Sequence, residues 1–119
     1  MYEVKTQLSF SAAHHLLNYN GLCENQHGHN WLVEVFARGN SLNESGILID
    51  FKSLKKELKE ILDELDHKDI NLLPDFQNES PSSENIARYI YFKLKEKFVQ
   101  LYKVSVWETS TSCASYFEV

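Results

Sequence analysis

The sequence has few cysteines and no long apolar run. Cys23 and Cys113 are the only cysteines among 119 residues, so at most one disulfide could form. The N-terminal stretch MYEVKTQLSF lacks the basic and apolar regions of a signal peptide, so we expect two free thiols and a cytoplasmic location. No segment approaches the roughly 20 apolar residues that a membrane-spanning helix needs, so we expect no role in a membrane.

Positive charge is also in short supply. Twelve basic residues stand against 17 acidic ones, which gives a net charge of −5. A negative field of this kind argues against nucleic acid and against anionic membranes as the main partner. An anionic substrate would need a local positive centre, which a bound metal ion could supply. We find no internal repeat, low-complexity tract or linker, and we therefore expect one domain over residues 1–119.

The periodicity of apolar residues predicts a ββααββ order. Alternation indicates strands, and apolar positions three or four apart indicate helices, the first of them capped by Asp50. We expect strands at 2–10, 29–38, 102–108 and 114–119, and helices at 51–66 and 83–99. This order predicts an α+β fold in which both helices pack on one face of a four-stranded antiparallel sheet. Such a sheet leaves edges exposed, which favours oligomerisation.

Two histidines one residue apart, His27 and His29, are typical of a metal site. On an extended chain they point to the same side, and Gly28 between them lets the backbone approach closely. His14 meets them if the first two strands form a hairpin across the 15–28 loop. Three neutral imidazoles suit zinc and leave a fourth position open, as in catalytic sites. Without His14, the pair is better interpreted as ordinary surface or core histidines.

Cys23 lies four residues before His27 and has two interpretations. As a fourth ligand it would close a structural Cys-His₃ site. As a free thiol beside the ion it would have a lowered pKa and act as a thiolate. The residues alone do not separate these interpretations, although the short loop slightly favours the open site. Cys113 has no predicted role, and His15 is expected to point away from His14.

The motif LDHKDIN places Asp66 and His67 at the end of the first helix. The pair suits a base with its orienting carboxylate. It also suits plain helix polarity, because a histidine near a helix C-terminus is favourable in any case. The second interpretation is the ordinary one for such a pair on its own.

Glu108 ends the strand YKVSVWE and shares a face with Tyr102, Val104 and Val106. If that face is the core side, the carboxylate is partly buried, which is costly unless donors match it. A carboxylate held in this way can anchor a ligand that carries paired N–H donors. Alternatively, the strand ends at Glu108 and its side chain is solvated.

Six motifs together resemble the 6-pyruvoyltetrahydropterin synthase / 6-carboxytetrahydropterin synthase family. They occur in the order and spacing of that family and cover nearly the whole chain: SFSAAH, CENQHGH, ILIDF, LDHKDIN, SPSSENIA and ETSTSCASY. The resemblance implies the tunnelling (T-) fold, whose order is ββααββ. It also implies trimers that stack into a homohexamer with active sites between subunits.

The resemblance further implies a substrate and a role for each candidate residue. The substrate would be 7,8-dihydroneopterin triphosphate. His14, His27 and His29 match the zinc ligands of the family. The remaining matches are Cys23 with the catalytic thiol, Asp66 and His67 with the relay pair, and Glu108 with the pterin anchor.

The branch of the family depends on two neighbouring residues. The short step from Cys23 to His27 resembles the bacterial enzymes that make 6-carboxy-5,6,7,8-tetrahydropterin for queuosine, with acetaldehyde and triphosphate as the other products. Glu24 resembles the glutamate of a subgroup that makes 6-hydroxymethyl-7,8-dihydropterin for folate. We favour the carboxypterin branch, because a thiolate beside zinc is the better base. The alternatives are the folate reaction, 6-pyruvoyltetrahydropterin synthesis, and a zinc-stabilised binding module without turnover.

Overall fold

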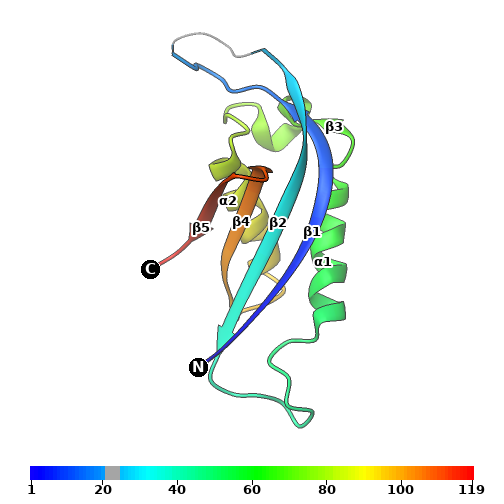
Figure 1. Cartoon of the computed structure of the whole chain (residues 1–119), viewed down its shortest axis with the longest axis vertical. Coiled ribbons are helices and arrows are strands. Elements are labelled where there is room, and N and C mark those ends of the chain that lie inside the picture. Colours follow the sequence, from blue (N-terminus) through cyan, green and yellow to red (C-terminus); the bar gives the residue numbers. More distant parts are fainter. Residues whose placement is uncertain (21–24) are drawn as a thin grey trace.

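A computed structural model describes residues 1–20 and 25–119 of the chain (Figure 1). Two long strands come first and two helices follow, with a very short strand and two 3-10 turns between the helices. A final pair of strands ends the chain. The strands are β1 (Tyr2–His14), β2 (His27–Gly39), β3 (Lys68–Asp69), β4 (Leu101–Thr109) and β5 (Ser112–Phe117), and the helices are α1 (Phe51–Asp63) and α2 (Ser83–Lys95).

The sheet has five strands in the order β3-β1-β2-β4-β5. The prediction of four antiparallel strands is correct for β1, β2, β4 and β5 and misses β3, which pairs in parallel with Ala12 and Ala13. A strand of two residues is too short to show an alternating pattern, so periodicity could not reveal it. The sheet is therefore mixed, and the α+β class stands.

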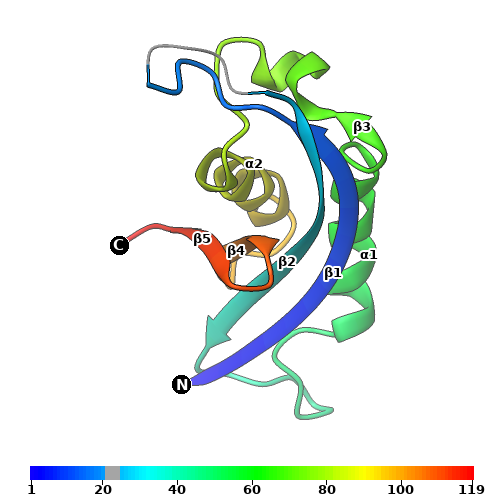
Figure 2. The same ribbon diagram turned by 45° about the horizontal axis from the view of Figure 1, so that its top comes forward.

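Both helices cover the same face of the sheet, as predicted. Asp50 caps α1 by accepting a hydrogen bond from the backbone N–H of Lys52 at 2.9 Å, and Ser82 caps α2. Figures 1 and 2 show α1 running along β1 and α2 lying over β4. The buried faces of the helices and of β1, β2 and β4 form one hydrophobic cluster. None of the helices in the described residues is long and apolar enough to cross a membrane.

The β1–β2 hairpin is longer than predicted at the end that carries the histidines. β1 continues to His14, and β2 already begins at His27, within the expected loop. Antiparallel pairing then sets His14 directly opposite His27. On both strands every second residue faces the helices, so Phe10, Ala12 and His14 share that face with Trp31. The register of the hairpin therefore brings the histidines together.

Candidate metal centre

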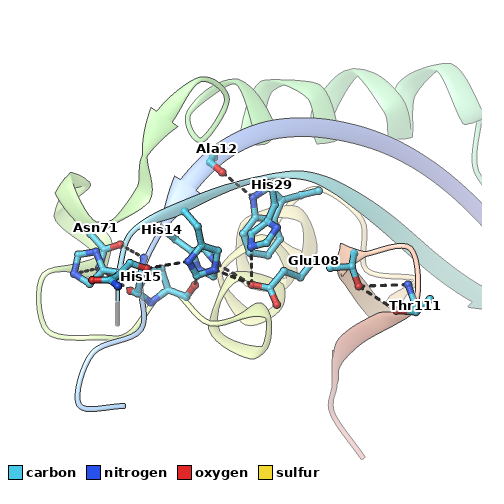
Figure 3. A network of polar contacts seen from close by, with 12 residues as sticks. Ala12, His14, His15, His29, Asn71, Glu108 and Thr111 are labelled. Carbon is cyan, nitrogen blue, oxygen red and sulfur yellow. Dashed lines mark hydrogen bonds and ion pairs between the residues drawn. The ribbon is translucent and has the colours of Figure 1, made fainter. Parts of the chain in front are cut away.

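Three imidazoles and one carboxylate converge at the end of the β1–β2 hairpin. The ligand atoms of His14, His27, His29 and Glu108 all lie within 4.8 Å of one another. Figure 3 shows His14 and His29 directed at Glu108. The predicted meeting of His14 with the His27–His29 pair is present in the structure. Four donors this close together, all nitrogen or oxygen, form a set that suits zinc.

The ring nitrogens of two histidines are oriented by backbone carbonyls. His14 Nδ1 lies 2.8 Å from the carbonyl oxygen of Pro81, and His27 Nδ1 lies 2.9 Å from that of Asn25. A carbonyl only accepts hydrogen bonds, so each Nδ1 carries the proton and donates it. In a neutral imidazole the lone pair is then on Nε2, which is the atom that faces the cluster. Metal-binding histidines are commonly held in this way.

Glu108 reaches the histidines from β4. Its Oε1 lies 2.8 Å from His14 Nε2, 3.2 Å from His29 Nε2 and 3.9 Å from His27 Nε2. The side chain is 32% exposed and also borders a pocket of about 190 Å³ that Ser83 of α2 helps to line. Glu108 is thus placed either to complete a four-ligand metal site or to face a ligand in the pocket.

The predicted face of β4 is correct for Val104 and Val106 and wrong for Tyr102. Both valines are fully buried in the core. The ring of Tyr102 instead lies against Phe36, with the Arg38 guanidinium 3.8 Å from the ring centre. The β2–β4 register shifts between Phe36 and Ala37, and this irregularity turns Tyr102 out of the alternation.

Trp31 forms the floor of the site. Its indole is fully buried and lies 4.8 Å from the His14 ring and 5.4 Å from the His29 ring, measured between centroids. The indole stacks on Phe10 and donates a hydrogen bond from Nε1 to the carbonyl oxygen of Ala12 at 3.2 Å. Two of the candidate ligands therefore rest on a rigid aromatic surface, which restricts their rotation.

The adjacent Asp66 and His67 form the predicted pair. Asp66 Oδ2 lies 3.0 Å from His67 Nδ1, while Oδ1 accepts a hydrogen bond from the Ser11 N–H at 2.9 Å. The bond from Ser11 is the main cause that holds the pKa of Asp66 below its usual value. His67 has a φ of 58°, in the left-handed region, and this residue turns the chain from α1 into β3.

The structure does not bring this pair into the histidine cluster of the same chain. His67 is 81% exposed and lines a groove of about 540 Å³ that Ser11, Ala13, Gly28 and His29 also line. Ser11, Ala13 and Gly28 alternate along β1 and β2 with the residues that face the helices, so this part of the groove lies on the opposite face of the sheet. Within the described chain, Asp66 and His67 are therefore not part of the four-donor cluster, although His29 borders the same groove as His67.

The sequence profile of the 6-pyruvoyl tetrahydropterin synthase family matches residues 3–119. The chain belongs to this family.

Relatives of this tetrahydropterin synthase family member cover almost all of its length. A 6-carboxy-5,6,7,8-tetrahydropterin synthase of Synechocystis sp. is 38% identical, over 98% of this chain and 94% of that protein. The 6-pyruvoyl tetrahydrobiopterin synthase of Homo sapiens is 34% identical, over 96% of this chain and 90% of that protein. The solved 6-pyruvoyl tetrahydropterin synthase of Caenorhabditis elegans superposes with a TM-score of 0.86 at 31% identity, covering 99% of this chain and 96% of that one. The predicted family, T-fold and lyase class are confirmed.

The roles of the predicted site residues of this tetrahydropterin synthase family member stay predictions. Cys23 and Glu24 lie outside the described residues. His15 is not in the cluster, and its backbone bonds to Asn71 instead. Cys113 is exposed and lines the same pocket as Glu108.

Sequence reasoning missed two partners in this site. It did not predict that Glu108 would contact the histidines, because the pairing of β2 with β4 is not visible in either strand alone. It also missed the Pro81 carbonyl, because a main-chain acceptor leaves no signal in the residue type.

Proposed function

We propose that this chain converts 7,8-dihydroneopterin triphosphate to 6-carboxy-5,6,7,8-tetrahydropterin, acetaldehyde and triphosphate, a step toward queuosine and other 7-deazapurines. The observation that carries the proposal is the convergence of His14, His27 and His29 on one point. The Cys23-to-His27 spacing and the name of the relative from Synechocystis sp. support the carboxypterin product.

His14, His27 and His29 hold the metal ion, and the donor set favours zinc. When bound there, zinc supplies a Lewis acid that acidifies the protons next to the hydroxyls of the substrate side chain. The Pro81 and Asn25 carbonyls keep the Nε2 lone pairs of His14 and His27 directed at the ion. Trp31 beneath the rings excludes water from that side of the site.

Cys23 is the base that removes and returns protons on the substrate side chain. A thiol near a cation has a lowered pKa, so the thiolate is populated near neutral pH. Glu24 directly follows it and is the candidate base for a second product, 6-hydroxymethyl-7,8-dihydropterin. A thiolate close to the metal favours the carboxypterin reaction over this alternative.

Glu108 anchors the pterin. Its carboxylate borders the pocket that Ser83, Glu84 and Ser112 help to line, and a carboxylate there can accept two N–H bonds from an aminopyrimidine edge. Anchoring the ring fixes the side chain of the substrate relative to the metal and the base. The contacts of Glu108 with the histidines favour a second possibility, in which Glu108 is a fourth metal ligand. The zinc content of a Glu108→Gln variant distinguishes the two roles.

His67, oriented by Asp66, carries the second proton in a site that two chains build together. The exposed pair is not part of the histidine cluster of its own chain, which supports delivery to the site of a neighbouring copy. In the described residues β5 pairs with β4 alone, and β1 pairs with β3 only at Ala12 and Ala13. These open edges suit the pairing of chains in a homohexamer.

The product assay tests the reaction. Zinc-loaded protein is incubated with 7,8-dihydroneopterin triphosphate, and the products are identified by mass. We expect 6-carboxy-5,6,7,8-tetrahydropterin and acetaldehyde. Hydroxymethylpterin would assign the folate reaction, and 6-pyruvoyltetrahydropterin would assign the reaction for which the human relative is named. Cys23→Ala should keep its zinc and lose carboxypterin formation, whereas Glu24→Gln, the matched neighbour, should keep both.

A thiol titration separates the enzyme from a zinc-stabilised binding module. In an open site, Cys23 of the zinc-loaded protein reacts with an alkylating reagent. In a closed Cys-His₃ site it reacts only after zinc is removed. Because Cys113 is an exposed free thiol, the titration is done in a Cys113→Ser background.

A further inference from the structure

The segment between β3 and α2, residues 70–82, forms hydrogen bonds with the last residue of β1 and with the residues that follow it. Asn71 accepts a hydrogen bond from the His15 N–H at 2.8 Å and donates one to the His15 carbonyl at 3.0 Å (Figure 3). Ser80 Oγ accepts from the Leu17 N–H at 3.0 Å. The Pro81 carbonyl accepts from His14 Nδ1 at 2.8 Å. The backbone that carries His14 and the His14 ring are therefore both held by this segment.

The Pro81 carbonyl depends on its neighbours for its position. Proline has no N–H, so Pro81 cannot be fixed by a donor of its own. Asn85 of α2 forms hydrogen bonds with both neighbours of Pro81. Its side-chain amide donates to the Ser80 carbonyl at 2.8 Å, and its backbone N–H donates to Ser82 Oγ at 3.1 Å. The amide of Asn85 is thus one bond away from the turn that orients His14.

We propose that Asn85 is a positioning residue for the metal centre. It holds the Ser80–Ser82 turn so that the Pro81 carbonyl keeps the His14 proton on Nδ1 and the Nε2 lone pair directed at the cluster. His14 is 1% exposed, so water cannot replace the carbonyl as acceptor. The inference rests on the proposed zinc site, and it assigns to Asn85 a role beyond its place in the first turn of α2.

Asn85→Asp tests this role with little change in shape. A carboxylate in the first turn of a helix is favourable, so α2 should remain formed. The carboxylate lacks the amide donor and repels the Ser80 carbonyl, so the turn should shift. Zinc affinity is measured by competition with a chelator. Because outer partners of metal-bound histidines typically contribute 10–100-fold to affinity, we expect the zinc Kd to rise by about 10–100-fold.

A second readout needs no metal. The ¹⁵N–¹H spectrum of histidine-labelled, zinc-free protein reports which ring nitrogen carries the proton, and His14→Gln assigns the signal. We expect a hydrogen-bonded proton on Nδ1 in the parent protein, whether or not Nε2 beside Glu108 is also protonated, and loss of this Nδ1–H signal in Asn85→Asp. Asn43→Asp is the matched control. It adds the same charge at the far end of β2 and keeps the side-chain oxygen that accepts from Ser45 and Ile47, so both readouts should match the parent protein.

Each outcome decides the inference. If Asn85→Asp binds zinc like the parent protein and keeps the Nδ1–H signal of His14, Asn85 is only part of the helix cap and the inference is wrong. If Asn85→Asp does not fold, Asn85→Ala, which removes the donor without adding repulsion, carries the same test. A parent protein that binds no zinc overturns the proposed function together with the inference. If the parent protein binds zinc and the Asn85 variant binds it equally well, the inference alone is overturned.

Discussion

Replacing Trp31 with phenylalanine should destabilise the fold and loosen the metal site together. The phenyl ring still stacks on Phe10 but has two carbons and the indole nitrogen fewer. At about 0.8 kcal/mol per buried CH₂, the carbons contribute about 1.6 kcal/mol. The lost hydrogen bond from Nε1 to the Ala12 carbonyl adds about 1 kcal/mol. We therefore expect the free energy of unfolding of the zinc-free protein to fall by about 2–3 kcal/mol.

Urea unfolding followed by far-ultraviolet circular dichroism measures this loss without using tryptophan as the probe. At a slope of about 2 kcal/mol per molar urea, the midpoint should fall by about 1 M. Trp107→Phe is the matched control. Trp107 loses the same atoms and a hydrogen bond, which it donates to the Glu34 carboxylate at 2.6 Å, and it lies half-buried on the face that the helices leave uncovered, so it is the control for zinc affinity. Zinc affinity should weaken only in the Trp31 variant. An unchanged zinc affinity in Trp31→Phe, or an equal loss of zinc affinity in the two variants, would refute the view that Trp31 supports His14 and His29.

Three further predictions concern single side chains. Asp66→Asn should lower the free energy of unfolding at neutral pH. The folded pKa of Asp66 lies below its usual value of 3.8, so its contribution to stability is present above about pH 4 and is lost as pH falls through the folded pKa. The difference in stability between variant and parent should therefore shrink in acid denaturation curves. Glu108→Gln should retain one zinc per chain by elemental analysis and lose product formation; loss of zinc would instead make Glu108 a fourth ligand. Ser82→Ala removes the N-cap of α2 and should lower the unfolding free energy by about 1 kcal/mol in urea titrations, and no change would contradict the capping role.

The sequence alone was sufficient for the main elements and for the three histidines. Alternating residues in the first two strands are a strong signal, and a hairpin between them forces His14 toward His27 once the register is set. The caps at Asp50 and Ser82 were also predictable, because the side chain that accepts the bond is the residue type itself.

Other features depend on contacts that no local pattern records. The two-residue strand β3 exists because the left-handed backbone at His67 brings Lys68 and Asp69 beside β1. Tyr102 leaves the core face because the β2–β4 register shifts beside it. The Asp66–His67 pair lies outside the histidine cluster because of the side of β1 that it reaches. Motif order along the chain carries no information about that side.

The most direct test of the zinc site is X-ray absorption spectroscopy at the zinc edge. The account predicts a first shell of nitrogen and oxygen atoms at about 2.0–2.2 Å, with His14, His27 and His29 supplying the nitrogens. Loss of any one of these histidines should remove a nitrogen or the metal. In a Cys113→Ser background, a sulfur shell at about 2.3 Å would place Cys23 on the ion. That result would contradict an open site with Cys23 as the base.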